Sequence, residues 1–497
     1  MGKLPKIISV ILSLIFVFSG CGQKYDVVDH KDYSSALLEE ISSNGELDFY
    51  SSDTDGFSSI VSYDELISGN FSSENASASS SNSLASNSSV VSNITSQKPS
   101  TSKPTTTSKP TTTKPVTTTS KPPSSSTPST PSAYTPPYYS TMKAVWLSYY
   151  NFYYDIKGKT ASSFRSYAKN IMKTVKDFGF NTIIVHLRSH GDAIYESAYY
   201  PWSSIVGKNP GFDPTQILIE EAHAQNLSFH AWFNPLRLST TKVLPTVDDK
   251  FQTKKWYNTK LGDYVVEFNG YYYLNPAYKE VRTLIINGAK EIAQKYKVDA
   301  LHIDDYFYPT TNPSFDSKAY ASLGGGNTLA YFRRNNVNTL IRGIYSAVKG
   351  VNSKLKFGIS PGGNIERNKN ELYADTTTWL QYSGYMDYCI PQIYWNYEHK
   401  THDFKKITNQ WKALATNNSV DLIIGLGYYK VGDSAYNTAS EGDEWVTDYT
   451  VIARQVKDCK TLLGSKYKGF AIFDYDELFE SSTTFRNNAK NELKKVM

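Results

Sequence analysis

Residues 298–309 have the sequence VDALHIDDYFYP. The segment begins with a short apolar run of the kind that a strand buried on both faces shows. It ends in two adjacent carboxylates, Asp304 and Asp305, and the aromatic residues Tyr306, Phe307 and Tyr308 follow them. In a (β/α)8 barrel the carboxyl ends of the strands carry the active site. Carboxylates beside aromatic rings suit a sugar-cleaving site, although the pair could instead cap a turn or form ion pairs.

From Met142 onward, apolar runs alternate with helix-period segments at regular intervals. This pattern predicts an α/β fold in which eight parallel strands close into a TIM barrel. A doubly wound open sheet is the alternative, but no glycine-rich phosphate loop follows the first strand. The expected strands are residues 143–149, 181–187, 228–233, 299–304, 356–360, 387–394, 421–427 and 469–473. The expected helices are residues 163–178, 214–225, 276–296, 327–348, 404–415 and 446–463.

The composition argues against a nucleic-acid-binding protein and against a disulfide-stabilised one. The chain has 497 residues and a net charge of +5, which gives no reason to expect nucleic acid as a partner. Its 3 cysteines imply no disulfide framework. The 39 tyrosines suit a carbohydrate or another polar, extended ligand, and equally a protein that uses Tyr on its surfaces and in its strands. We expect a monomer without a cofactor.

The first residues resemble an export signal. Lys3 and Lys6 precede an apolar stretch, residues 7–18, that is too short to span a bilayer. The segment closes on Phe-Ser-Gly-Cys21, which resembles the bacterial lipobox. That resemblance implies cleavage before Cys21, lipidation of its thiol, and an anchor on the outer face of the cytoplasmic membrane. A plain secretory signal with an incidental cysteine is the alternative.

The chain divides into four parts. Residues 1–21 are the expected signal peptide, and residues 22–70 form a weakly structured segment without an assigned domain. Residues 71–140 are rich in Ser, Thr, Pro and Lys and repeat a Lys-Pro-Thr-Thr-Thr unit, so they cannot build a core. We expect a disordered tether there. Residues 141–497 form the expected barrel.

Polar and aromatic residues recur at the ends of nearly all the expected strands, while the strand starts show no such concentration of them. This asymmetry predicts an active site at the strand ends. Arg188 is expected to pair with a carboxylate, with Asp192 or Asp304 as the natural partner. The candidate substrate-binding residues are Arg188, Asp192, Trp232, Asn234, Arg237, Tyr306, Gln392, Tyr394, Trp395 and Asp474.

Several segments resemble the glycosyl hydrolase-like 10 family, including KAVWLS, FGFNTIIVHLRSHGDAIYES, VDALHIDDYFYP and MDYCIPQIYWN. The resemblance implies an exported bacterial glycoside hydrolase that acts on cell-wall glycan strands. It also implies roles for the residues in four family motifs. These are Arg188 and Asp192 in R-x-x-G-D, Asn234 and Arg237 in N-P-x-R, Asp304 and Asp305 in D-D-Y, and Gln392, Tyr394 and Trp395 in P-Q-I-Y-W.

Asp304 and Asp305 are the candidate catalytic residues, with Asp305 as acid/base and Asp304 as an orienting or nucleophilic carboxylate. In one mechanism an acetamido group of the substrate attacks, and in the other a partner acid on another strand takes part. Asp474, Asp192 and Glu366 remain open as partner acids.

Two other interpretations remain. His186, His190, His230 and His302, together with Asp304, could form a metal site, although we expect none because their spacing does not match the H-x-H of metal-dependent barrels. A barrel that keeps an aromatic groove but lacks a competent acid pair would be a non-catalytic scaffold that binds the cell wall.

Overall fold

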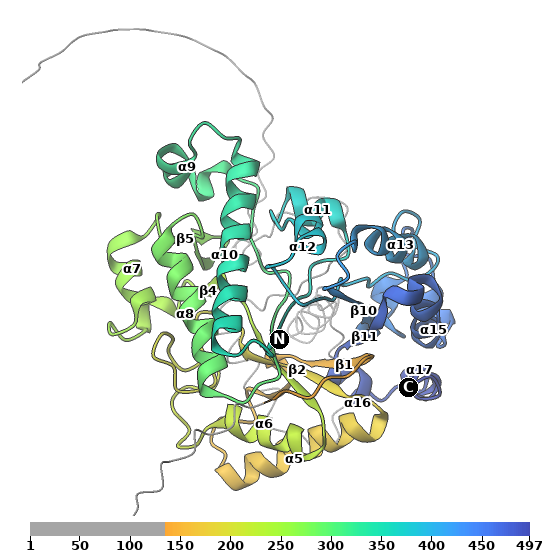
Figure 1. Cartoon of the computed structure of the whole chain (residues 1–497). Coiled ribbons are helices and arrows are strands. Elements are labelled where there is room, and N and C mark those ends of the chain that lie inside the picture. Colours follow the sequence, from red (N-terminus) through yellow and green to blue (C-terminus); the bar gives the residue numbers. More distant parts are fainter. Residues whose placement is uncertain (1–134) are drawn as a thin grey trace, which may run out of the picture. The chain divides into compact units, whose positions relative to one another are not determined.

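The computed structural model describes residues 135–497 (Figure 1). The expectations for the signal peptide with Cys21, for residues 22–70 and for residues 71–134 of the tether lie outside the described residues.

Eight parallel strands close into a barrel in the order β1-β11-β10-β9-β8-β7-β3-β2. The prediction of a (β/α)8 barrel is therefore confirmed, and each of the eight expected strands is present. Their bounds are β1 Met142–Leu147, β2 Thr182–Arg188, β3 Ser228–Phe233, β7 Ala300–Ile303, β8 Lys356–Ile359, β9 Tyr388–Cys389, β10 Asp421–Gly427 and β11 Tyr467–Phe473.

Amphipathic helices cover the barrel. In α5, Thr160 caps the first turn by accepting from the backbone of Ser163, and Gly179 at φ 106° ends the helix. The helix expected over residues 446–463 is two helices, α14 and α15. The helices of the described chain are α4 Tyr149–Phe152, α5 Ala161–Phe178, α6 Pro214–Ala224, α7 Gln252–Lys260, α8 Lys279–Lys295, α9 Ser317–Leu323, α10 Leu329–Val351, α11 Ile365–Asn370, α12 Thr376–Gln381, α13 Phe404–Leu414, α14 Glu444–Thr447, α15 Val451–Leu463, α16 Tyr475–Phe479 and α17 Thr484–Lys494.

An insertion follows β3 that the sequence pattern did not predict. It is a three-stranded antiparallel sheet in the order β4-β6-β5, joined by the short helix α7. Figure 1 shows β4, β5 and α7 together at one side of the barrel. The strands are β4 Arg237–Thr240, β5 Val265–Phe268 and β6 Tyr271–Leu274.

The barrel interior is packed with side chains rather than open. Trp146, Ile184, Trp232 and Tyr388 belong to one buried cluster inside the strands. The hydroxyl of Tyr388 lies 3.2 Å from Nδ1 of His302, and Trp146 Nε1 donates to His302 Nε2 at 3.3 Å. A much larger apolar cluster fills the layer between strands and helices, as in other barrels of this type.

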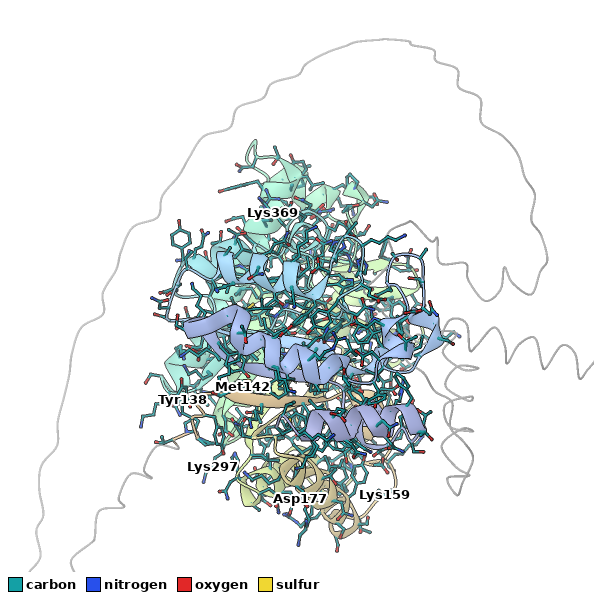
Figure 2. The ribbon with its side chains drawn as sticks, turned by 90° about the vertical axis from the view of Figure 1, so that its right-hand side faces the viewer. Tyr138, Met142, Lys159, Asp177, Lys297 and Lys369 are labelled. Atoms are coloured by element: carbon teal, nitrogen blue, oxygen red, sulfur yellow. The ribbon has the colours of Figure 1, made fainter. Side chains whose placement is uncertain are left out.

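The chain enters the barrel at the starts of the strands. Residues 136–140 lie beside Met142, Thr182 and Ser228, which are at or next to the first positions of β1, β2 and β3. Tyr139 anchors this segment by donating to the backbone oxygen of Asn226 at 2.6 Å. Figure 2 shows Tyr138 and Met142 together on this side of the molecule. Residues 136–140 therefore lie at the face of the barrel opposite to the strand ends.

Within residues 135–497, none of the helices has the length and apolar character needed to cross a membrane.

Candidate functional site

Asp304 follows directly after β7 and is almost completely buried, with 4% of its surface exposed. Its Oδ2 accepts a hydrogen bond from Trp232 Nε1 at 3.1 Å, and its Oδ1 accepts from the backbone of Tyr306 at 3.2 Å. Trp232 points into the barrel from β3, where its ring stacks on that of His186 with the centroids 3.6 Å apart. Asp304 is thus held in one orientation by two neighbours.

Asp305 is more open than Asp304 and only half-buried. Its Oδ1 accepts a long hydrogen bond of 3.4 Å from Gln392 Nε2, which also donates to the backbone oxygen of Ser360 at 3.0 Å. The two aspartates both face the barrel mouth because β7 ends at Ile303, so the alternation of a regular strand no longer applies.

Burial and the neighbouring Asp305 carboxylate hold the pKa of Asp304 well above its usual range. Burial also raises the pKa of Asp305, and the guanidinium of Arg367 opposes that rise. Two carboxyls that repel each other in a desolvated site ionise as a pair. The pair therefore retains a proton closer to neutral pH than isolated aspartates do.

Asp474 follows the end of β11 and caps α16, where its side chain accepts from the backbone of Glu477 at 3.4 Å. Burial raises its pKa to about 7. The buried Tyr394 ties Asp474 to the pair, because burial and then the charges of Asp305, Asp474 and Asp304 raise the pKa of its hydroxyl. The charges of acids from two strand ends therefore act on one tyrosine hydroxyl.

The other two candidate partner acids lie elsewhere. Asp192 accepts from the backbone of His190 at 3.3 Å and lines a separate cavity. Glu366 accepts from Asn370 one helical turn later, at 3.1 Å in an exposed position. Of the three candidates, only Asp474 acts on Tyr394 together with the aspartate pair.

The expected ion pair of Arg188 is absent, and this prediction is wrong. The register between β2 and β3 shifts after His186, and Arg188 is buried with its guanidinium over the rings of Tyr200, at 4.0 Å, and Phe233, at 4.8 Å. A methyl group on Gly288 of α8 would lie 2.6 Å from its Nη1. Among the described residues, its nitrogens make no hydrogen bond or ion pair with a carboxylate. Arg188 therefore fills the layer between strand and helix.

Asn234 and Arg237 do lie beside the pair. Asn234 Oδ1 accepts from Trp232 Nε1 at 3.1 Å, and its amide donates to the backbone oxygen of Ser189 at 3.1 Å. The guanidinium of Arg237 lies 4.1 Å from the ring centroid of Tyr306. Its positive charge works against the rise in the pKa that burial imposes on both Asp304 and Asp305.

The four aromatic residues among the candidate substrate-binding residues differ in exposure. Trp232, Tyr394 and Trp395 are each 5% exposed, whereas Tyr306 is half-buried. The Trp395 ring stacks on His402 with centroids 4.9 Å apart. These rings are mainly part of the wall of the site, and Tyr306 is the one that offers most surface to a substrate.

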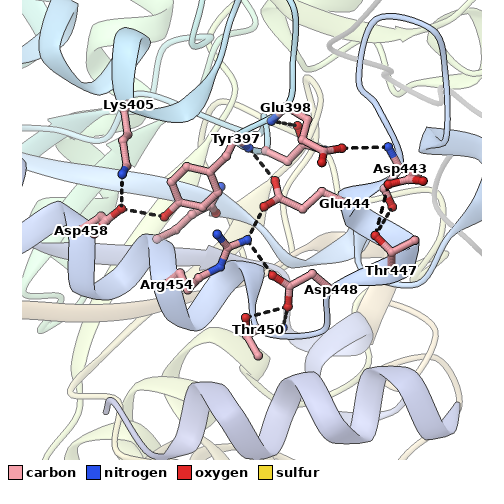
Figure 3. A network of polar contacts seen from close by, with 12 residues as sticks. Tyr397, Glu398, Lys405, Asp443, Glu444, Thr447, Asp448, Thr450, Arg454 and Asp458 are labelled. Carbon is pink, nitrogen blue, oxygen red and sulfur yellow. Dashed lines mark hydrogen bonds and ion pairs between the residues drawn. The ribbon is translucent and has the colours of Figure 1, made fainter.

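A polar network fixes the loop that carries Trp395. The backbone of Tyr397 donates to Glu444 Oε2 at 2.7 Å, and its hydroxyl donates to Asp458 at 3.0 Å (Figure 3). Arg454 joins the same network through ion pairs with Glu444 and with Asp448. The loop after β9 is therefore tied to α14 and α15.

The histidines are used in packing and hydrogen bonding. His230 lies 2.8 Å from the Tyr388 hydroxyl, which also contacts His302, so both rings belong to the barrel core. Burial and Arg237 hold the pKa of His190 well below its usual range. No group of three or more His, Cys, Asp or Glu within the described chain is arranged to hold a metal ion.

Arg367 is a site residue that the sequence did not reveal. It lies on α11, a helix of 6 residues that begins after the Asn364 cap, and its charge acts on Asp305. The cap residue is a usable signal for this short helix, but the sequence alone does not show which way the helix points.

The fold and its strand-end acids define a (β/α)8 barrel of the glycosidase type, with carboxylates at the mouth. The chain belongs to the glycosyl hydrolase-like 10 family, whose model matches residues 141–445. It is 33% identical over 339 residues to the glycosyl hydrolase YngK of Bacillus subtilis, with 62% of this chain and 65% of that protein aligned. It is 31% identical over 282 residues to the glycosyl hydrolase DigH of Escherichia coli K12, with 51% of this chain and 64% of that protein aligned.

Among solved structures, the glycoside hydrolase domain of PgaB (BpsB) from Bordetella bronchiseptica aligns with a TM-score of 0.47 and 12% identity, over 72% of this chain and 99% of that one. This similarity is too low to bear on function. The chain covers just under two thirds of the length of the two curated relatives named above.

Proposed function

We propose that the protein is an extracellular glycoside hydrolase that cleaves O-glycosidic bonds in a polysaccharide, most specifically in peptidoglycan glycan strands. The observation that carries this proposal is the acid cluster at the barrel mouth. Asp304, Asp305 and Asp474 all act on Tyr394, and burial raises the pKa of each acid. A site with protonated and ionised carboxyls together is what glycoside hydrolysis requires.

In the proposed reaction, Asp305 is the acid/base because it is the more exposed member of the pair. It gives a proton to the leaving oxygen while the acetamido oxygen of the substrate attacks the sugar carbon, and it then takes a proton from the water that displaces the acetamido oxygen from that carbon. Asp304 is too enclosed to attack a sugar carbon, since Trp232 and the Tyr306 backbone hold it. Asp304 orients the acetamido group of the substrate and balances the positive charge that develops on the sugar ring.

The polysaccharide class can be tested with the full chain. Incubation with peptide-free glycan strands should release reducing ends, whereas cellulose and mannan should remain intact. If no N-acetylated glycan is cut, yet glycan strands still bind, the protein is a non-catalytic wall-binding scaffold.

The proposed location is the outer face of the cytoplasmic membrane, through a lipid on Cys21. Labelled palmitate should enter the wild-type protein and not a Cys21→Ala variant. Equal labelling of the two proteins would contradict the anchor.

A further inference from the structure

A second cavity opens beside the acid cluster and shares none of its carboxylates. Its volume is about 490 Å³, which falls within the range of pockets that bind small ligands. Three parts of the chain form its walls: the residues after β1, the long loop between β2 and α6, and the insertion after β3. Of the candidate site residues, Asp192 lines this cavity, and Arg237 comes from the same insertion but is not part of the lining.

The cavity is lined mainly by aromatic, aliphatic and uncharged polar residues. Tyr150, Trp202 and Tyr271 contribute rings, and His190 and Ser239 contribute polar atoms. Trp202 is fixed in place because its Nε1 donates to Glu196 at 2.9 Å. His190 remains neutral because burial and Arg237 hold its pKa well below the usual range.

The charges that line the cavity do not select an anion. Its lining contains two acidic residues, Asp192 and Asp248, and one basic residue, Lys208. Aromatic rings with neutral donors and acceptors are suited to the apolar faces and hydroxyls of an uncharged sugar.

A chain of contacts connects the cavity to the acids. Asp304 accepts from Trp232, the Trp232 ring stacks on His186, and the His186 ring lies 5.4 Å from that of Tyr149, which lines the cavity. Leu238, which lines the cavity, directly follows Arg237 in the sequence. The guanidinium of Arg237 lies over the ring of Tyr306. These contacts place the cavity within a few side chains of the acid pair.

We infer that this cavity is a distal subsite that binds an uncharged pyranose unit of the glycan, away from the bond that is cleaved. The inference rests on the proposed glycan substrate and adds a second point of attachment to it. A subsite of this kind makes affinity depend on the length of the glycan.

The test uses the full chain and peptide-free glycan-strand oligosaccharides of four and eight sugars, with binding measured by calorimetry. The wild-type protein should bind the octasaccharide about tenfold more tightly than the tetrasaccharide, a typical gain from one added aromatic contact. Trp202→Ala should abolish this gain and leave the affinity for the tetrasaccharide within about twofold. Tyr382→Ala, which removes a ring that is 60% exposed and does not line the cavity, is the control and should retain the gain.

A second variant shows whether a folding defect, rather than the loss of the ring, explains the result with Trp202→Ala. Ser204 is exposed and lines the cavity, so Ser204→Trp should fill the space and abolish the gain without disturbing the core. An octasaccharide gain that survives in both variants would overturn the subsite while leaving hydrolysis untouched. A gain lost in both variants supports the subsite even if the wild-type protein cuts nothing. If neither oligosaccharide binds the wild-type protein, the subsite is overturned as well.

Discussion

Trp232 Nε1 donates a hydrogen bond to Oδ2 of Asp304 at 3.1 Å inside the barrel. A donor of this kind favours the ionised carboxylate and works against the burial that raises its pKa. The indole therefore helps to orient Asp304 and lowers its affinity for a proton. This relationship joins a core residue of β3 to the proposed chemistry at the end of β7.

Trp232→Phe should keep a ring against His186 and remove the donor to Asp304. The pKa of the pair should rise, so the acidic limb of the pH–activity profile should move up by about 0.5–1 pH unit, and activity on that limb should fall about three- to tenfold. The measurement is kcat/KM against pH.

Trp146→Phe is the matched control for that variant, because Trp146 lies in the same interior cluster but donates to His302. It should lose a similar amount of stability without a shift in the pH profile. An equal shift in both variants would show that the effect comes from packing.

Asp474→Asn should stabilise the protein at alkaline pH. Burial raises the folded-state pKa of Asp474 to about 7, against about 3.9 in an unfolded chain. The folded state therefore holds the proton more tightly, and this residue lowers stability progressively as the pH rises from about 4 to about 7. Asparagine does not ionise, so the variant should gain on the order of 1–3 kcal/mol over wild type at pH 8 and much less at pH 5.

Urea unfolding of both proteins at the two pH values checks this prediction. Asp177→Asn is the control, since its carboxylate side chain is 61% exposed on α5. A gain of the same size at pH 5 and pH 8 would contradict the role assigned to burial.

Gly288→Ala should destabilise the protein through Arg188. The added methyl group would lie 2.6 Å from Arg188 Nη1 and 2.6 Å from the ring of Tyr200, so both buried groups must move. We expect a loss of about 1–3 kcal/mol in the free energy of unfolding.

Gly350→Ala near the end of α10 is the matched control. A methyl group there meets nothing within 4 Å, so stability should stay level or rise by about 0.5–1 kcal/mol. Equal stability of the Gly288→Ala and wild-type proteins would mean that Arg188 is not held tightly between strand and helix.

Trp395→Ala should behave as a core substitution. Although its position at a strand end suggests a sugar platform, the ring is 5% exposed and packs on His402. Thermal or urea unfolding should show a loss of about 3–5 kcal/mol. Tyr306→Ala, at a half-buried ring, should instead weaken glycan binding with little effect on stability. The reverse pattern would make Trp395 the platform.

The sequence predicted the barrel well because its strands are buried on both faces and alternate with amphipathic helices. It did not predict the sheet of β4, β5 and β6, whose strands have only four residues each and lie outside that alternation. Arg188 was misplaced because the register shift after His186 rotates its side chain outward. The burial of the Trp395 ring depends on residues distant in the sequence, such as Gly363, where an added Cβ would lie 2.5 Å from that ring.

In the proposed mechanism, the Asp304–Asp305 pair carries hydrolysis. The most direct measurement is the rate of reducing-end release from peptide-free glycan strands by the wild-type, Asp304→Asn, Asp305→Asn and Asp177→Asn proteins, each shown to be folded. We predict that the two site variants lose at least about 100-fold in rate, since proton transfer contributes roughly that much or more, while Asp177→Asn keeps full activity. Full activity in both Asp304→Asn and Asp305→Asn would contradict the claim.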